Sequence, residues 1–208
     1  MIIVPSFKLK YNIETGVYTI ISLVTSVCPQ CNGGVHYRDR KVRGVKNSRG
    51  EKRLFSLRRL LCELCEKLHT EIPDIMQPFK HYESAVIQCI LDGSKEADEC
   101  AADNSTLRRW RASFAKAKPD ITQRLTSIYA QMSDETAPIG SNVPTLSTIQ
   151  TMVKQWLAFV MTLLINNGHK ICTQFAFCPH PLVDRIEPNY KATMKGEGKS
   201  DKSIEDTS

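Results

Sequence analysis

The sequence predicts an α+β fold, with a β-rich N-terminal part followed by a mostly α-helical region. Three observations lead to this prediction. Two Cys-x-x-Cys pairs are separated by a strongly basic segment, β-branched and aromatic runs surround the first pair, and apolar residues recur at helical spacing after residue 79. The predicted divisions of the chain are 1–78 (β-rich, with both cysteine pairs), 79–118 and 119–190 (both helical), and 191–208 (a disordered tail).

The two cysteine pairs predict a metal site. Cys28 and Cys31 form the first pair, Cys62 and Cys65 form the second, and 30 residues lie between the inner cysteines. Two such pairs supply four thiolates in the tetrahedral arrangement that structural zinc prefers, as in a zinc ribbon. Iron in a rubredoxin-like site is the alternative, because it binds the same ligands. The basic residues between the pairs argue against a redox role, so we expect Zn²⁺.

Other side chains offer weaker metal-binding hypotheses. His69 follows Cys65 by four residues and could replace a thiolate as a ligand. A second site of the Cys2His2 type would use residues of irregular spacing near the C-terminus, which are His169, Cys172, Cys178 and His180. The alternative is that these are four independent residues of a loop, and that cysteines outside the two pairs are small buried hydrophobes.

The segment between the cysteine pairs carries the main charge signal. From His36 to Arg59 it holds ten Lys or Arg against two acids, in a chain of net charge +6. Apolar residues on both sides of a polar stretch predict a long β-hairpin with its tip near residues 47–50, pinned by the metal. Such a charge density favours a polyanionic partner, although a solvated face is the ordinary alternative. The expected phosphate contacts are Arg38, Arg40, Lys41, Arg43, Arg49, Lys52 and Arg53.

Helical patterns begin after residue 79. They predict a helix that ends at Asp92-Gly93, a short segment over 95–102, and a helix over 107–117 whose buried face holds Trp110. This layout is typical of a helix-turn-helix, in which the last helix enters the DNA major groove. A helical hairpin with solvated arginines is the alternative. The residues expected to contact DNA are Ser105, Thr106, Arg108, Arg109 and Arg111.

The remainder of the chain predicts further helices. One covers 120–132, a loop follows at 138–144, and a longer helix runs from Thr145 to a stop at Gly168. The apolar stripe of this last helix favours a core or a homodimer interface through residues 145–167, and its apolar run is too short to span a membrane. No secretory signal is evident at the N-terminus, so we expect a cytoplasmic, nucleoid-associated protein without a membrane partner.

Several runs resemble a known group of sequences. CPQCNGG, YRDRKVR, LRRLLCELCEKLHTEIPD, PFKHYESAVI and NSTLRRWRASF are similar to uncharacterised bacterial proteins described as a domain of unknown function. Members of that group look like a zinc ribbon joined to a transposase-type helix-turn-helix and occur around insertion elements. The resemblance covers about residues 28 to 115. It implies a metal site and DNA binding, and it carries no established activity.

Together these patterns predict a non-enzymatic, zinc-binding and DNA-binding protein, associated with a mobile element or with transcription regulation. One alternative is a transposase or a transposase remnant. A strand-transfer nuclease needs several carboxylates on an α/β core, and the acids after Lys118 show no strand pattern between them. The other alternative is an RNA-binding or protein-interaction zinc-ribbon module.

Overall fold

The computed structural model describes residues 1–94, 100–132 and 144–169, which lie within one compact unit, Met1–Phe175. These residues form a six-stranded sheet and four helices, which confirms the α+β prediction. The strands are β1 (Ile2–Val4), β2 (Phe7–Asn12), β3 (Val17–Ser22), β4 (Val35–Lys46), β5 (Lys52–Cys62) and β6 (Leu68–Pro73). The helices are α1 (Ser84–Asp92), α2 (Asn104–Met132), α3 (Leu146–Met152) and α4 (Trp156–Asn166).

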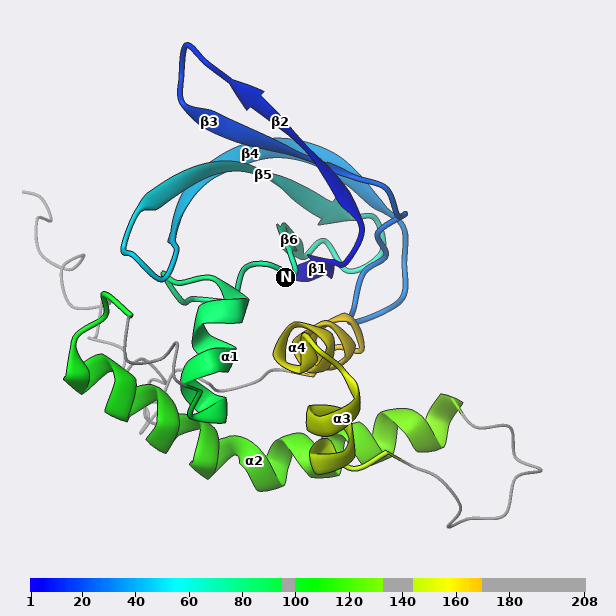
Figure 1. Ribbon diagram of the computed structural model, residues 1–208. Coiled ribbons are helices and arrows are strands. Elements are labelled where there is room, and N and C mark those ends of the chain that lie inside the picture. Colours follow the sequence, from blue (N-terminus) through cyan, green and yellow to red (C-terminus); the bar gives the residue numbers. More distant parts are fainter. Residues whose placement is uncertain (95–99, 133–143, 170–208) are drawn as a thin grey trace, which may run out of the picture. The chain divides into compact units, whose positions relative to one another are not determined.

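Strand β5 is the centre of the sheet. It pairs with β4 along one edge, and its other edge pairs in parallel with β3 and antiparallel with β6. Strand β2 extends the sheet beyond β3, and β1 pairs in parallel with β6. Figure 1 shows that the long β4–β5 pair curls over α1 and α4, so one face of the sheet is covered by helices. The β-rich lead-in expected before the first cysteine pair therefore belongs to the same sheet as the hairpin.

The predicted long hairpin is confirmed. Its register runs from Val35 opposite Cys62 to Lys46 opposite Lys52. The turn is closed by a hydrogen bond from the Asn47 amide to the Glu51 carbonyl, 3.1 Å long. Because β5 ends at Cys62, the base of this hairpin lies at the second cysteine pair and its tip lies at the opposite end of both strands.

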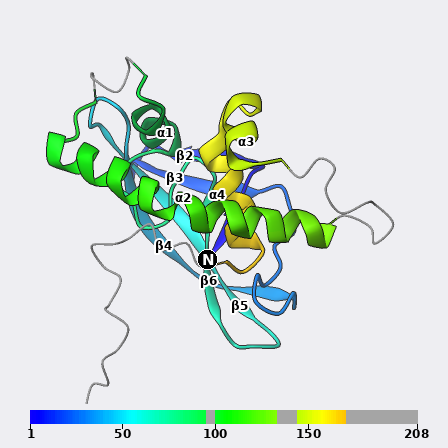
Figure 2. The same ribbon diagram turned by 90° about the horizontal axis from the view of Figure 1, so that it is seen from below.

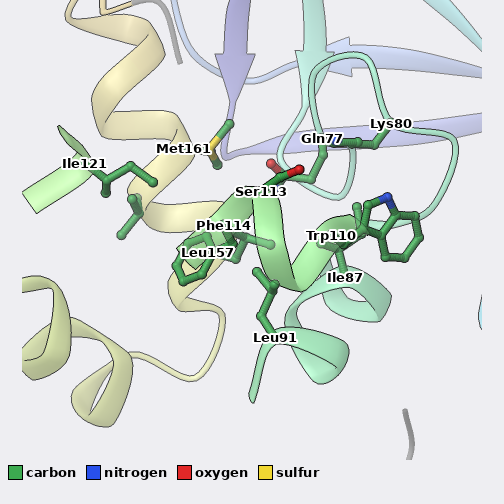
Figure 3. A pocket seen from close by; sticks show the side chains of 11 residues that line it. Gln77, Lys80, Ile87, Leu91, Trp110, Ser113, Phe114, Ile121, Leu157 and Met161 are labelled. Carbon is green, nitrogen blue, oxygen red and sulfur yellow. The ribbon is translucent and has the colours of Figure 1, made fainter. Parts of the chain in front are cut away.

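The core lies between the sheet and the helices. The sheet contributes Phe55 and Leu57, which are fully buried, and the helices add Trp110, Leu125 and Trp156. Figure 3 shows the junction of α1, α2 and α4, where apolar side chains line a cavity of about 40 Å³. A cavity of that size holds only a few water molecules. The junction is therefore part of the packed core.

Helix α2 corrects two sequence predictions. We expected separate helices over 107–117 and 120–132, and the structure has one helix with Pro119 inside it. Its buried positions continue in one helical register past the proline: Trp110, Ala117, Ile121, Leu125 and Ile128. Pro119 itself is exposed, so water can satisfy the carbonyl that loses its amide partner. The predicted division at residue 118 thus falls within a continuous helix.

The helix predicted over 145–167 is also interrupted, because Val153 is extended between α3 and α4. The side chain of Gln88 pairs with the backbone there, accepting from the Leu157 amide and donating to the Lys154 carbonyl. The apolar residues of α4 that suggested a homodimer are buried within this chain. Among the described residues, no helix combines the length and apolar character that a membrane crossing requires.

The end of α4 lies close to the N-terminus and to the loop of the first cysteine pair (Figure 2). The side chain of Asn166 pairs with both backbone groups of Ile3, at 2.9 and 2.8 Å. Gly168 approaches Pro29 so closely that a Cβ there would lie 2.3 Å from the Pro29 carbonyl oxygen. The helical part therefore contacts the loop that holds the first cysteine pair. The predicted stop at Gly168 agrees with a φ of 77°.

Some predictions fall outside the described residues. The short segment expected over 95–102 is described only from residue 100, and the loop at 138–144 only from residue 144. The tail over 191–208 is outside as well. So are three of the four residues of the second metal-site hypothesis, which are Cys172, Cys178 and His180.

Candidate metal centre and basic surface

The structure brings the four predicted thiolate ligands together. Their sulfur atoms all lie within 4.8 Å of one another. Cys28 Sγ is 3.6 Å from Cys65 Sγ, and Cys31 Sγ is 3.5 Å from Cys62 Sγ. A zinc ion with Zn–S bonds of 2.3 Å gives sulfur–sulfur distances of about 3.8 Å in a tetrahedron. The cluster therefore has the size and chemistry of a four-thiolate metal site such as that of zinc.

Both cysteine pairs have the same backbone geometry. The amide of Cys28 donates to the Gly33 carbonyl at 2.9 Å, and the amide of Cys62 donates to the Lys67 carbonyl at 3.1 Å. The residue after each pair is left-handed, with φ of 56° at Asn32 and 55° at Glu66. Asparagine tolerates that conformation and glutamate rarely adopts it. The geometry is thus imposed at Glu66 by the turn around the sulfurs.

Backbone amides point at the sulfur atoms. The amide of Cys65, together with that of Leu64, lowers the pKa of the Cys62 thiol to about 6. Hydrogen bonds of this kind favour the thiolate, which is the form that binds a metal. The amide of Gly33 likewise lowers the pKa of Cys31, but the Cys62 side chain and burial outweigh it and raise that pKa to about 12. Crowded thiols cannot all ionise unless a cation compensates their charge.

Of the three histidines in the weaker metal hypotheses, His69 and His169 are described by the structure, and they lie in different surroundings. His69 is buried, and its Nε2 is 3.3 Å from Cys28 Sγ, although it is not part of the group in which all ligand atoms are mutually close. Burial lowers the pKa of His69. His169 Nδ1 is 3.4 Å from the guanidinium of Arg124. The other three residues of the second-site hypothesis, Cys172, Cys178 and His180, are outside the described residues.

Among the seven hairpin cations predicted to contact phosphate, Arg43 and Arg53 have partners outside the hairpin. Arg43 donates to the backbone carbonyls of Gln77 and Lys80, and burial lowers its pKa. Arg53 forms an ion pair with Glu83. Sequence reasoning missed these partners because each lies about 30 residues further along the chain.

Ion pairs also hold other cations of the hairpin. Arg58 binds the buried carboxylate of Glu71 through two hydrogen bonds of 2.7 and 2.9 Å, and Ser26 donates to the same carboxylate. Arg59 pairs with Asp39, and this lowers the pKa of Asp39. The local excess of +8 in the sequence therefore overstates the charge that a partner would meet on the hairpin.

The remaining predicted hairpin cations are exposed: Arg38, Arg40, Lys41, Arg49 and Lys52. Arg38 lies 3.9 Å from Asp39, and Arg40 donates to the Ser56 carbonyl at 3.3 Å. Lys52 lies across Gly44 on the opposite strand, where any added Cβ would meet the lysine side chain. These contacts are made at the surface and leave the charges in solvent.

The start of α2 is organised by Asp103. Its carboxylate accepts from the Thr106 amide and from the hydroxyls of Thr106 and Ser105. Hydrogen bonds from the Ser105 side chain and from the backbone and side chain of Thr106 lower the pKa of Asp103 to about 2. This hydrogen bonding caps the N-terminus of α2. It also shows that both hydroxyl groups predicted to contact DNA take part in the cap.

The three arginines of α2 that were predicted to contact DNA differ in their contacts. Arg108 is exposed, whereas Arg109 donates to the Thr106 hydroxyl at 3.1 Å. The Nε of Arg111 donates to the Ile90 carbonyl in the last turn of α1, at 3.1 Å. The helix-turn-helix stays a prediction, since its expected middle segment lies largely outside the described residues.

The hairpin tip and the start of α2 meet in the structure. The Ala101 amide donates to the Ser48 carbonyl at 2.8 Å, and Figure 1 shows the hairpin turn and the start of α2 at one end of this unit. The Lys46 ammonium lies 5.7 Å from the ring of Tyr82, and that ring packs edge-on against Trp110. We call the cations of the hairpin tip, of the segment before α1 and of the start of α2 the tip surface: Lys46, Arg49, Lys52, Lys80, Arg108 and Arg109.

Sequence reasoning did not include Lys46 and Lys80 among the contact residues. Lys46 pairs with the segment before α1 through the Lys46 amide, which donates to the His81 carbonyl at 2.7 Å, and through its carbonyl, which accepts from the Glu83 amide. Burial, and then the charge of Arg109, lowers the pKa of Lys80. The position of Lys46 next to the predicted hairpin tip was a usable signal, whereas nothing local in the sequence placed Lys80 beside α2.

Comparison with known proteins gives one match. No curated protein and no solved structure matches the chain. Residues 28–110 match the model of a family described as Domain of unknown function (DUF6431). That range begins at the first cysteine of the metal site and ends at Trp110, so it contains both cysteine pairs, the hairpin, α1 and the start of α2. Over this range the chain is similar to an uncharacterised domain-of-unknown-function family, as the resemblance implied.

Proposed function

We propose that this protein is a zinc-binding, DNA-binding protein without catalytic activity, and that the tip surface is its contact with DNA. The observation that carries the proposal is the hydrogen bond between the Ala101 amide and the Ser48 carbonyl. It joins the hairpin tip to the residues just before α2. Two segments that were predicted separately to contact DNA, and that are about 50 residues apart in the sequence, are thereby brought close together.

The charges support a polyanion as the partner. Cations already paired with carboxylates, such as Arg58 and Arg59, gain little from a further anion, whereas exposed Arg49, Lys52 and Arg108 can each displace a counterion from a phosphate. In this proposal the hairpin tip contacts the DNA backbone, and Arg108 reaches a base edge by bidentate hydrogen bonds.

Zinc has a structural role in the proposal. The four thiolates would hold it at the base of the hairpin, where β5 enters the second cysteine pair and where Gly168 contacts the first. The metal would thus brace one end of the β4–β5 pair and leave the tip free to contact DNA. Association with a mobile element or with transcription regulation rests on the sequence resemblance alone, as does a nucleoid location.

The test measures affinity for duplex DNA as the salt concentration rises. Removing two phosphate contacts should reduce the slope of log K against log salt by about 2. We expect this from Arg49→Gln with Lys52→Gln, the two hairpin-tip cations that contact the DNA backbone in this proposal. The matched control is Lys8→Gln with Lys10→Gln, which removes the same charge from exposed positions of β2. A slope near zero for the wild type would contradict the proposal. So would a reduction of the slope in the control that equals the reduction in the tip variant.

Experiments on the same purified protein distinguish the two alternative functions from DNA binding. An RNA-binding module would prefer single-stranded or hairpin RNA over duplex DNA in competition, and a protein-interaction module would bind neither with a salt-dependent affinity. A transposase or an active remnant would cleave or join DNA strands when Mg²⁺ or Mn²⁺ is supplied. Selection from a random DNA pool would then show whether Arg108 reads a sequence.

A further inference from the structure

The sulfur atoms of the metal site differ in burial. Cys28 and Cys62 are almost completely buried, whereas Cys31 is exposed. Four thiolates around one divalent cation carry a net charge of −2, and a buried charge is costly unless hydrogen bonds compensate it. Backbone amides supply such bonds to the sulfurs of Cys31, Cys62 and Cys65.

For Cys28 the side-chain partner apart from the cluster itself is His69. The Nε2 atom of His69 is 3.3 Å from Cys28 Sγ, which is a normal distance for an N–H donor and a sulfur. His69 is only 3% exposed, so water has little access to the imidazole. A hydrogen-bond donor at this position would stabilise the charge of the Cys28 thiolate, which is the most buried of the four.

The other imidazole nitrogen determines which atom carries the proton. His69 Nδ1 is 3.0 Å from the nitrogen of Met1, which is a donor. A neutral imidazole has one donor and one acceptor nitrogen. Because Nδ1 accepts from Met1, the proton lies on Nε2 and points to the sulfur.

The sheet places His69 and Met1 side by side. His69 is on β6, where it lies opposite Leu60 of β5, two residues before Cys62. Strand β1 pairs in parallel with the same strand β6, with Ile2 opposite Glu71. This pairing brings the Met1 nitrogen to the Nδ1 atom of His69. We propose that His69 is a positioning residue of the metal site, which donates its Nε2–H to the Cys28 thiolate and so slows the release of the metal.

The test uses the zinc-loaded full chain and two substitutions. His69→Leu removes the donor, and His69→Gln keeps an N–H donor near the position of Nε2. The rate of zinc transfer to a chromogenic chelator should rise about 10-fold to 100-fold in His69→Leu, as for other lost partners of metal ligands. His69→Gln should retain most of the wild-type half-life. His36→Gln is the matched control, since His36 lies near the same end with its side chain 52% exposed.

Three results would overturn the proposal. The first is zinc release from His69→Leu at the wild-type rate, and the second is equally fast release from both His69 variants. The third comes from nitrogen NMR of the zinc-loaded wild type, which is independent of whether the variants fold. We expect the imidazole proton of His69 to be on Nε2. A proton on Nδ1 would show that His69 is not the donor, and so would an Nε2 atom bonded to the metal. None of these results depends on DNA binding.

Discussion

The two ends of the β4–β5 hairpin are held by different kinds of contact. At the base, four thiolates converge within 4.8 Å, and Arg58 and Arg59 near them are paired with carboxylates. At the tip, backbone hydrogen bonds to His81, Glu83 and Ala101 and the contact between Lys46 and Tyr82 join the hairpin to the helical part, while Arg49 and Lys52 are exposed. The comparison teaches that charge density in the sequence does not show which cations are available to a partner.

The largest expected effect is at the base. Removing the metal with a chelator, or Cys62→Ser, should unfold the hairpin base, because the thiolates there repel one another without a cation and the turn at Glu66 is strained. Elemental analysis should find one zinc per chain, and hydrogen exchange should then show loss of protection first around Cys62. Should a metal-free chain keep its protection at Cys62, the metal would not be what holds the base.

A second substitution examines the tip end. Trp110→Ala removes a buried ring that packs against Tyr82, so the free energy of unfolding should fall by about 3–5 kcal/mol. Chemical denaturation of the zinc-loaded protein measures the loss. Trp110→Phe is the milder control. A loss below about 1 kcal/mol for the alanine variant would mean that this junction contributes little to holding the tip.

The third prediction compares a cation that has partners within the fold with an exposed cation on the same strand. Arg43→Met removes a partly buried guanidinium that donates to two carbonyls, and we expect a loss of about 2 kcal/mol. Lys41→Met removes an exposed cation on the same strand and should change stability by less than about 0.5 kcal/mol. Denaturant unfolding of both variants gives the comparison. Equal losses would show that burial does not separate these two residues.

The smallest expected effect concerns pH at the start of α2. The pKa of Asp103 is lowered to about 2 from its ordinary value of 3.8, first by the Ser105 hydroxyl and then by Thr106. A lowered pKa means that the cap stabilises the folded chain above about pH 4 and that this contribution disappears as pH falls towards 2. The difference in melting temperature between wild type and Asp103→Ala should therefore shrink over that interval. A difference that stays constant from pH 5 to 2 would contradict the role of this carboxylate.

Much of the fold was predictable because its determinants are local. The spacing of Cys28, Cys31, Cys62 and Cys65 predicted the cluster, since each pair closes a tight turn and a hairpin brings the turns together. The alternating apolar residues and the polar turn predicted β4 and β5, and Gly93 with its left-handed φ of 68° ended α1 as expected. In each case the residues that decide the structure are near neighbours or hydrogen-bonded partners within one hairpin.

The tertiary structure alone decided which of these residues have partners. Nothing near Arg43 or Arg53 in the sequence shows that Gln77 and Glu83 will meet them. Pro119 would end an isolated helix, but the core continues on the face opposite to it. The sequence by itself therefore determined the thiolate cluster, the hairpin and the helix end at Gly93. Folding determined which cations remain exposed, since the partner of a charge depends on long-range packing of segments that no local pattern specifies.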